Sequence, residues 1–501
     1  MGTTKHTRSR RPWPSTRARL PLVVRSIVLP WGRRRPPGVV VQAAARGDAV
    51  SGENGAGGDA GLVLGGGGAR GAYASGALSV LLPELKDQVR VIVGTSAGAL
   101  IASYLAANWQ RPVEEAIEDG LRFWRELRFG DVFAPLMAPG GVVRFARYIG
   151  EFLPVSTMRA PSILNPEPLK QTLARLVDFE RLSENIREQR MALGVVATPA
   201  YSNRSVVFHQ GGIARHHDDP LRGIEYVATA LGAEHMLASS AIPALFPATR
   251  VTAPEEAAGW YFDGGPRLNT PIKPALWLGA KRVIVIALNS VAPSRTPQPE
   301  HQPDFYVGAA HLLHAALGDP LAQDIRTLAN TNALIAAGRV APDGHAEQRL
   351  AVCRGRPRGL EPVQPVPYIL IAPENPCAIG ELAQRVYRKH YGRPWNAGAR
   401  DLWLLGRVLD AGADAMHGEL LSYVFFAGEF AEELIALGQA DARRWIDEHP
   451  ADLWQLEPLP DWSPAPSGDI DALSSPQRAR ARAAVAAREL GSVARAQQRG
   501  G

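Results

Sequence analysis

The sequence predicts an α/β protein with three layers, in which helices cover a central, mostly parallel sheet, followed by a helical C-terminal region. Three observations support this fold class. Apolar runs typical of strands alternate with helix-forming segments from residue 61 to about 290. Two of these runs lead through a glycine-rich turn directly into a helix. Apolar residues also recur at helical spacing within 401–437.

The predicted strands are short and either apolar or aromatic. They cover Leu62–Leu64, Val89–Val93, Ala192–Ala197, Val206–His209, Trp260–Phe262 and Val283–Leu288. Beyond them we expect helices over 304–317 and 319–338, a last strand at Tyr368–Ile371, and helices through 378–447.

These patterns divide the 501 residues into five parts. Residues 1–58 form a basic arm and linker that we expect to be disordered, and residues 59–290 form the main α/β domain. Residues 291–375 form a helical extension with a Pro/Arg-rich loop and the last strand. Residues 376–457 form the C-terminal helical region, and residues 458–501 form a tail that we expect to be disordered.

The net charge of +6 hides two parts of opposite charge. Residues 1–46 hold 11 Lys and Arg and no acidic residue, while the rest of the chain holds 44 basic and 49 acidic side chains, a net of −5. Three interpretations of the arm stay open: a disordered tail, a stretch before the true start of the protein, or a segment attracted to anionic lipid surfaces. We expect no nucleic-acid binding, because no readout fold accompanies the arm.

The arm predicts neither a membrane span nor an export signal. Its apolar run, Leu20 to Pro30, contains Arg25 and is far shorter than the roughly 20 residues that cross a bilayer. Arg10-Arg11 lacks the apolar stretch of an export signal. We therefore expect a cytoplasmic protein, with peripheral membrane contact if the arm binds lipid.

The sequence predicts no metal site. Cys353 and Cys377 are the only cysteines and have neither a metal-binding spacing nor a disulfide framework. The run His216-His217-Asp218-Asp219 precedes Pro220 and is typical of a solvated loop.

Gly94-Thr95-Ser96-Ala97-Gly98 lies between a predicted strand, Val89–Val93, and a predicted helix, Ala97–Ala107. A serine at the apex of a strand–turn–helix is a nucleophile elbow, which raises the hydroxyl above the sheet edge and near the positive end of the helix. Gly94 and Gly98 lack the Cβ atoms that would clash in so tight a turn. Ser96 is therefore the candidate nucleophile.

A second glycine-rich turn, Gly65 to Gly71, follows the strand Leu62–Leu64. Its backbone N–H groups can approach an anion closely. Gly66, Gly68 and Gly71 also match the spacing of a dinucleotide-binding loop, but such a loop requires an acidic residue after the next strand, where this chain has Gly94-Thr95-Ser96.

A third motif, Asp263-Gly264-Gly265, ends the short aromatic strand Trp260–Phe262. It places a carboxylate beside two glycines that leave room for a substrate. Asp263 is the candidate partner of Ser96.

These three motifs, in this order, resemble the patatin-like phospholipase family over residues 61–290. Two more stretches fit the family, Ala238 to Pro247 and Leu268 to Pro271. The resemblance implies a three-layer patatin-like fold whose catalytic domain is residues 59–290. It also implies a Ser96–Asp263 dyad without histidine, no metal or organic cofactor, and substrates that are phospholipids or other glycerolipid esters.

The resemblance further implies that the glycine-rich loop forms the oxyanion hole. The amides of Gly67 and Gly68 are the first candidates, with Gly66 or Ala69 as additional donors. Arg70 and Gly71 support this motif, and three roles for Arg70 stay open: steadying the loop, pairing with a carboxylate, or approaching a lipid phosphate.

Other interpretations are also open. A Ser-His-Asp triad would use one of the histidines after Asp263, none of which lies in a short turn after a strand: His301, His311, His314, His345, His390, His417 and His449. The protein could instead be a transacylase, or a non-catalytic lipid-binding or scaffolding protein on the same fold.

Two aromatic regions each have two interpretations. Residues 123–152, with Phe123, Trp124, Phe129, Phe133, Phe145, Tyr148 and Phe152, are either a lid or acyl-chain groove, or an ordinary helical layer on the sheet. Residues 403–426, from Trp403 to Phe426, are either a membrane-docking stripe or core.

Overall fold

The computed structural model describes residues 59–135, 162, 164–189, 191–212, 223–291, 302–340, 364–393 and 400–456. The predicted arm, the C-terminal tail and the 216–219 loop lie outside the described residues. So do Phe145, Tyr148 and Phe152 of the first aromatic region.

The described strands form one sheet in the order β5-β4-β3-β2-β1-β8-β9, with β7 pairing to β3 and β6 to β7. The pairs β3–β2, β2–β1, β1–β8 and β8–β9 are parallel, whereas β4 and β7 run antiparallel to β3. The predicted α/β class with a mostly parallel sheet is confirmed. The strands are β1 (Ala60–Leu64), β2 (Val89–Thr95), β3 (Ala192–Pro199), β4 (Ser205–Gly211), β5 (Ile224–Ala228), β6 (Thr249–Val251), β7 (Gly259–Asp263), β8 (Arg282–Ile286) and β9 (Tyr368–Ile371).

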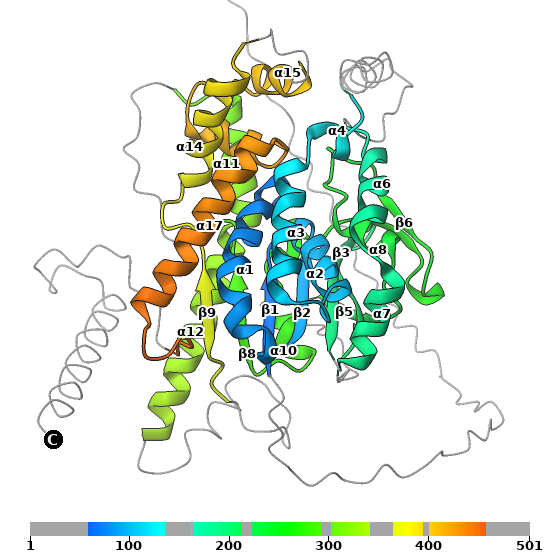
Figure 1. Ribbon diagram of the computed structural model, residues 1–501, viewed down its shortest axis with the longest axis vertical. Helices are drawn as coiled ribbons and strands as arrows, with labels where there is room; N and C mark the ends of the chain where they lie inside the picture. The colour runs from blue at the N-terminus through cyan, green and yellow to red at the C-terminus, as the bar shows by residue number, and fades with distance from the viewer. Residues whose placement is uncertain are drawn as a thin grey trace, which may run out of the picture. The chain divides into compact units, whose positions relative to one another are not determined.

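The sheet has an apolar core on each face, because alternate residues of its apolar strands point to opposite sides. In β1, Leu62 and Leu64 join one core and Val63 the other. The first face is covered by α1 (Gly71–Leu85), α2 (Ala97–Ala107), α3 (Val113–Glu126) and α17 (Gly428–Glu448). The second is covered by α9 (Gly265–Leu268), α10 (Ile272–Trp277) and α12 (Asp319–Val340). The fold is therefore three-layered (Figure 1).

The helical C-terminal region packs directly on the α/β layers. Helix α17 lies so close to α1 that a Cβ at Gly76 would collide with the backbone of Ile435, and one at Gly438 with that of Tyr73. The remaining helices are α4 (Phe129–Val132), α6 (Glu167–Leu176), α7 (Phe179–Glu188), α8 (Ala233–Ser239), α11 (Phe305–Leu317), α14 (Ala378–Val386), α15 (Arg400–Val408) and α16 (Ala415–Ser422), with a π-helical turn at Tyr387–Tyr391.

The segment after α16 belongs to the core. Tyr423, Val424, Phe425 and Phe426 are all buried, and the ring of Phe425 stacks on Phe430 with centroids 5.0 Å apart. The membrane-docking interpretation is wrong for these four residues. Within the described part of the chain, no helix is both long and apolar enough to cross a membrane.

Candidate active site

Ser96 occupies the sharp turn between β2 and α2. Its φ of 54° and ψ of −124° are strained for a residue with a side chain, and such strain persists only where neighbouring groups hold it. The Thr95 hydroxyl donates to the carbonyl of Leu268 at 2.9 Å, and the Ser96 amide donates to the Ser239 hydroxyl at 2.9 Å. These two bonds fix the turn from both sides.

The glycines around Ser96 are required by close packing. A Cβ at Gly94 would collide with the carbonyl of Gly98, and a Cβ at Gly98 would collide with the carbonyl of Leu64 in β1. The turn therefore folds back on itself while α2 starts against the neighbouring strand, as the elbow motif predicts.

Asp263 lies at the end of β7, opposite Ala197 of β3, and is 4% exposed. Its Oδ1 accepts a hydrogen bond from the Gly265 amide at 2.7 Å, and its carboxylate is hydrogen-bonded to the side chain of Ser96. Burial raises the pKa of Asp263 from 3.8 to about 7, against the lowering effect of those two hydrogen bonds. Gly264 is confined too, since a Cβ there would lie 2.6 Å from the Val196 carbonyl oxygen.

The glycine-rich loop after β1 contacts the same turn, and a Cβ at Gly66 would lie 2.9 Å from the Ser96 Cβ. The Gly66 amide donates to Asn269 Oδ1 at 3.0 Å, and the Ala69 amide donates to the Tyr423 carbonyl at 3.0 Å. No described atom accepts a hydrogen bond from the amide of Gly67 or Gly68. Of the four candidate oxyanion donors, Gly67 and Gly68 are thus the two whose amides have no acceptor among the described residues.

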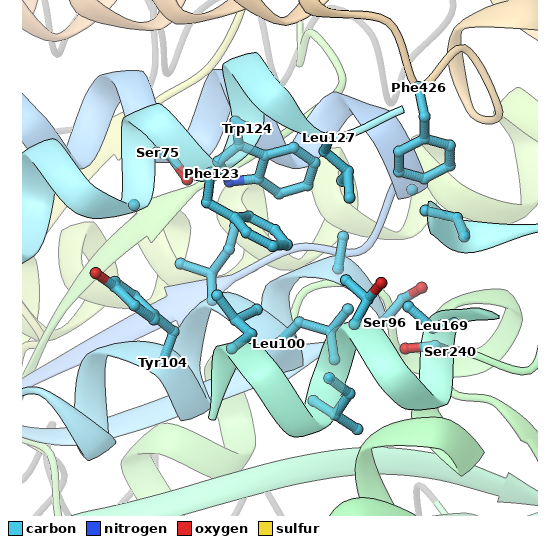
Figure 2. A pocket seen from close by; sticks show the side chains of 18 of the residues that line it. Ser75, Ser96, Leu100, Tyr104, Phe123, Trp124, Leu127, Leu169, Ser240 and Phe426 are labelled. Atoms are coloured by element: carbon cyan, nitrogen blue, oxygen red, sulfur yellow. The ribbon is translucent and has the colours of Figure 1, made fainter. Parts of the chain in front are cut away.

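An apolar cavity begins at Ser96 and runs between helices. Its empty space is about 1040 Å³, a volume that includes space open to solvent. Leu100, Ile101 and Tyr104 of α2 form one wall, and residues of α1, α3 and α6 and of the 240–246 and 423–426 segments complete the lining. Figure 2 shows Ser96 towards one end and Tyr104 towards the other, with Leu100 between them. Tyr104 follows Ser96 by eight positions along α2, a rise of roughly 12 Å.

Tyr104 bounds the far end of this cavity. Its hydroxyl donates to the Ala116 carbonyl at 2.7 Å, which ties α2 to α3, and a Cβ at Gly120 would lie 3.2 Å from its ring. The cavity has the length and apolar lining to hold a hydrocarbon chain whose carboxyl end meets Ser96.

Residues 62–276 match the family model of patatin-like phospholipases. These residues form a patatin-like phospholipase domain. Comparison with curated protein sequences gives no match.

Two solved structures are similar to this chain at low identity. VipD from Legionella pneumophila is 15% identical over 63% of this chain and 61% of VipD, with a TM-score of 0.26. The match therefore spans about six tenths of VipD. The heterodimeric ExoU–SpcU complex of the Pseudomonas aeruginosa type III secretion system is 16% identical over 78% of this chain and 77% of the other, with a TM-score of 0.24.

Arg70 of the patatin-like domain is structural. It is 1% exposed, forms an ion pair with Glu419, and donates to Asn289 Oδ1 at 3.0 Å. Its guanidinium also lies 3.8 Å from the centre of the Tyr423 ring. Two of the three interpretations, pairing with a carboxylate and steadying the loop, therefore describe it, whereas a lipid phosphate has no access to its buried side chain. Gly71 next to it is packed under Trp124, where a Cβ would lie 2.6 Å from the ring.

Aromatic side chains from three separate segments surround the Ser96 end of the cavity. The Phe133 ring centre lies 5.2 Å from that of Phe246 and 5.6 Å from that of Phe426. Phe123 and Trp124 line the cavity further along. The described rings of the 123–152 region pack in the helical layer, and three of them, Phe123, Trp124 and Phe133, also line the cavity. A role as a lid or acyl-chain groove stays a hypothesis.

Among the described residues, no hydrogen bond joins a histidine to Ser96 or Asp263. His417 Nδ1 lies 2.9 Å from the Asp410 carbonyl, and its Nε2 lies 3.1 Å from a carboxylate oxygen of Asp304. His449 Nδ1 lies 2.8 Å from the Trp445 carbonyl. Nor do the described residues contain a group of three or more side chains that could hold a metal ion.

Sequence reasoning missed two residues that hold the patatin-like site together. Ser239 and Asn269 lie in stretches that fit the family, yet their hydrogen bonds to the Ser96 and Gly66 amides cross 143 and 203 residues of chain. A polar residue beside a motif is the only local signal of such a contact.

Proposed function

We propose that this protein is a serine lipid acyl hydrolase that cleaves carboxylic esters of glycerolipids, with phospholipase A, lysophospholipase or esterase activity. One observation carries the proposal: the Ser96 hydroxyl is hydrogen-bonded directly to the buried carboxylate of Asp263 at the start of an apolar cavity. The family match at residues 62–276 supports the ester-hydrolase class.

In the proposed acylation, Ser96 Oγ bonds to the ester carbonyl carbon while its proton passes to Asp263. A base with a pKa of about 7 suits this transfer near neutral pH. The Gly67 and Gly68 amides donate to the carbonyl oxygen as negative charge develops there. The bond to the alcohol oxygen then breaks, and Asp263 returns the proton to that oxygen.

In the proposed deacylation, water attacks the acyl-enzyme and gives one proton to Asp263, which passes it to Ser96 Oγ as the acid leaves. The cavity between α2, α3 and α6 holds the acyl chain throughout, because its lining is almost entirely apolar. This placement requires the ester carbonyl to lie at the Ser96 end.

Covalent labelling tests the dyad. A fluorophosphonate probe should label the wild type and not Ser96→Ala, and Asp263→Asn should lower turnover by orders of magnitude. His417→Ala is the control, since His417 is a buried histidine that is paired with the carboxylate of Asp304 and has no hydrogen bond to Ser96 or Asp263 among those found in the described residues. Labelling of a different serine in Ser96→Ala, or a strict calcium requirement, contradicts the proposal.

We also propose that the basic arm, residues 1–46, draws the protein to anionic lipid surfaces. Its 11 positive charges without any negative charge support this, because each basic residue near such a surface contributes up to about 1 kcal/mol. The remaining chain is net acidic and would be repelled, so the arm would govern encounter with lipid rather than the chemistry.

A further inference from the structure

A short segment, Ser239 to Ala241, connects the two members of the dyad. The Ser239 hydroxyl accepts from the Ser96 amide at 2.9 Å and donates to the Val196 carbonyl at 2.6 Å. The Ala241 carbonyl accepts from the Asp263 amide at 2.9 Å. The residue between them, Ser240, is thereby held beside both Ser96 and Asp263.

The Ser240 side chain is buried without a partner among the described residues. The residue is 6% exposed, and no described atom makes a hydrogen bond with its hydroxyl oxygen. It lines the same cavity as Ser96, and Figure 2 shows it near Ser96. Buried hydroxyl groups normally have a hydrogen-bond partner, as the adjacent Ser239 hydroxyl does. A buried hydroxyl that lines a cavity and lacks such a partner therefore indicates a contact with a ligand.

The proposed mechanism already assigns the donors to the carbonyl oxygen. The Gly67 and Gly68 amides belong to the loop after β1 and serve the carbonyl oxygen in the proposed mechanism. Ser240 belongs to the segment that holds Asp263, the group that must return a proton to the departing alcohol. This segment places Ser240 next to the residue that bonds to Asp263, which in the proposed mechanism protonates the alcohol oxygen.

We propose that Ser240 contacts the substrate, donating a hydrogen bond to the alcohol oxygen of the ester as its bond to the carbonyl carbon breaks. This inference rests on the proposed function. The proton that the alcohol gains comes from Asp263, and Ser240 keeps its own. Water that later attacks the acyl-enzyme occupies the same position and hydrogen-bonds to Ser240 while it gives one proton to Asp263.

A leaving-group comparison tests this role. Two esters with the same octanoyl chain are used, one of p-nitrophenol and one of glycerol. The p-nitrophenolate leaves readily without a hydrogen bond, whereas the glycerol oxygen needs one. Ser240→Ala should lower kcat/KM for the glycerol ester about ten-fold, which is the loss expected from one hydrogen bond. The kcat/KM for the p-nitrophenyl ester should stay within about two-fold of the wild-type value.

Two further variants make the comparison specific. Ser75→Ala removes another hydroxyl that lines the same cavity, from α1, and should leave the ratio of the two kcat/KM values unchanged. Ser240→Thr keeps a hydroxyl and should restore kcat/KM for the glycerol ester. A role of Ser240 in packing alone would not predict this recovery. Fluorophosphonate labelling of Ser96 in each variant shows that the elbow is intact.

Equal losses on both esters, or no loss on either, would overturn the role of Ser240 while leaving the dyad in place. So would a Ser75→Ala variant with the same selective loss. If the wild type cleaves neither ester and Ser96 is not labelled, the proposed function fails and the role of Ser240 fails with it.

Discussion

Replacing Asp263 with asparagine is expected to stabilise the folded protein at alkaline pH, although it removes the proposed base. Burial raises the pKa of this carboxyl from 3.8 to about 7. Between those pH values the native carboxyl keeps its proton while the unfolded one has lost it. Unfolding then releases a proton, so the stability of the wild type falls as pH rises through this window.

The magnitude follows from the same two pKa values. Each pH unit within the window changes the free energy of unfolding by about 1.4 kcal/mol, so the whole window corresponds to about 4 kcal/mol. A comparison of pH 5 with pH 8 covers the part of this window between pH 5 and the native pKa of about 7, which corresponds to about 3 kcal/mol in the free energy of unfolding. The asparagine side chain of the Asp263→Asn variant carries no charge at either pH and keeps an oxygen that can accept from the Gly265 amide.

Urea unfolding, followed by tryptophan fluorescence at pH 5 and pH 8, measures this effect. The stability of Asp263→Asn relative to the wild type should increase by about 3 kcal/mol between the two pH values. Asp87→Asn removes an exposed carboxylate, and its free energy of unfolding should change between the two pH values by the same amount as that of the wild type. If Asp263→Asn also changes in parallel, the carboxyl is not a buried group with a raised pKa and the reasoning is refuted.

Three further predictions concern activity. Because Asp263 must be ionised to accept a proton, kcat/KM for a soluble ester should rise with pH up to about 7 and then level off; a plateau already reached at pH 5 would contradict this. Tyr104→Ala should extend the preferred acyl chain in a series of p-nitrophenyl esters, since it removes the ring that bounds the cavity, and an unchanged preference would mean that the cavity does not hold the acyl chain. Deleting residues 1–46 should weaken binding to anionic vesicles at low salt while hydrolysis of a small soluble ester is unchanged; equal binding by both forms would exclude the arm as a tether.

The strands and turns that carry the motifs could be predicted because their signals are local. Each of three short segments predicts a strand or the turn that ends it: Val89–Val93, the glycines around Ser96, and the aromatic run before Asp263. The structure has a strand or turn at each of these places. Strand β6 could not be predicted, since it has three residues and an arginine in the middle. It forms because Arg250 pairs with Trp260 of β7, a contact that no local pattern shows.

The donors of the glycine-rich loop illustrate the same limit. Four consecutive residues offer equivalent amides in sequence, and only tertiary contacts distinguish them. The side chain of Asn269 accepts a hydrogen bond from the Gly66 amide, and the Tyr423 carbonyl accepts one from the Ala69 amide. The partners come from after β7 and after α16, so the choice of Gly67 and Gly68 depends on segments far along the chain.

The glycine-rich loop therefore owes its shape to residues beyond the matched domain, which ends at 276. Gly68 has a φ of +58°, and a Cβ there would collide with the Tyr423 carbonyl, so the loop is pressed directly against the end of α16. Arg70, two residues later, forms an ion pair with Glu419 of the same helix and donates a hydrogen bond to the Ser422 hydroxyl at 2.8 Å. Phe426 adds a wall of the cavity from the same segment. Because these contacts hold the two free amides in place beside Ser96, the C-terminal helices are part of the candidate active site and not an appendage to it.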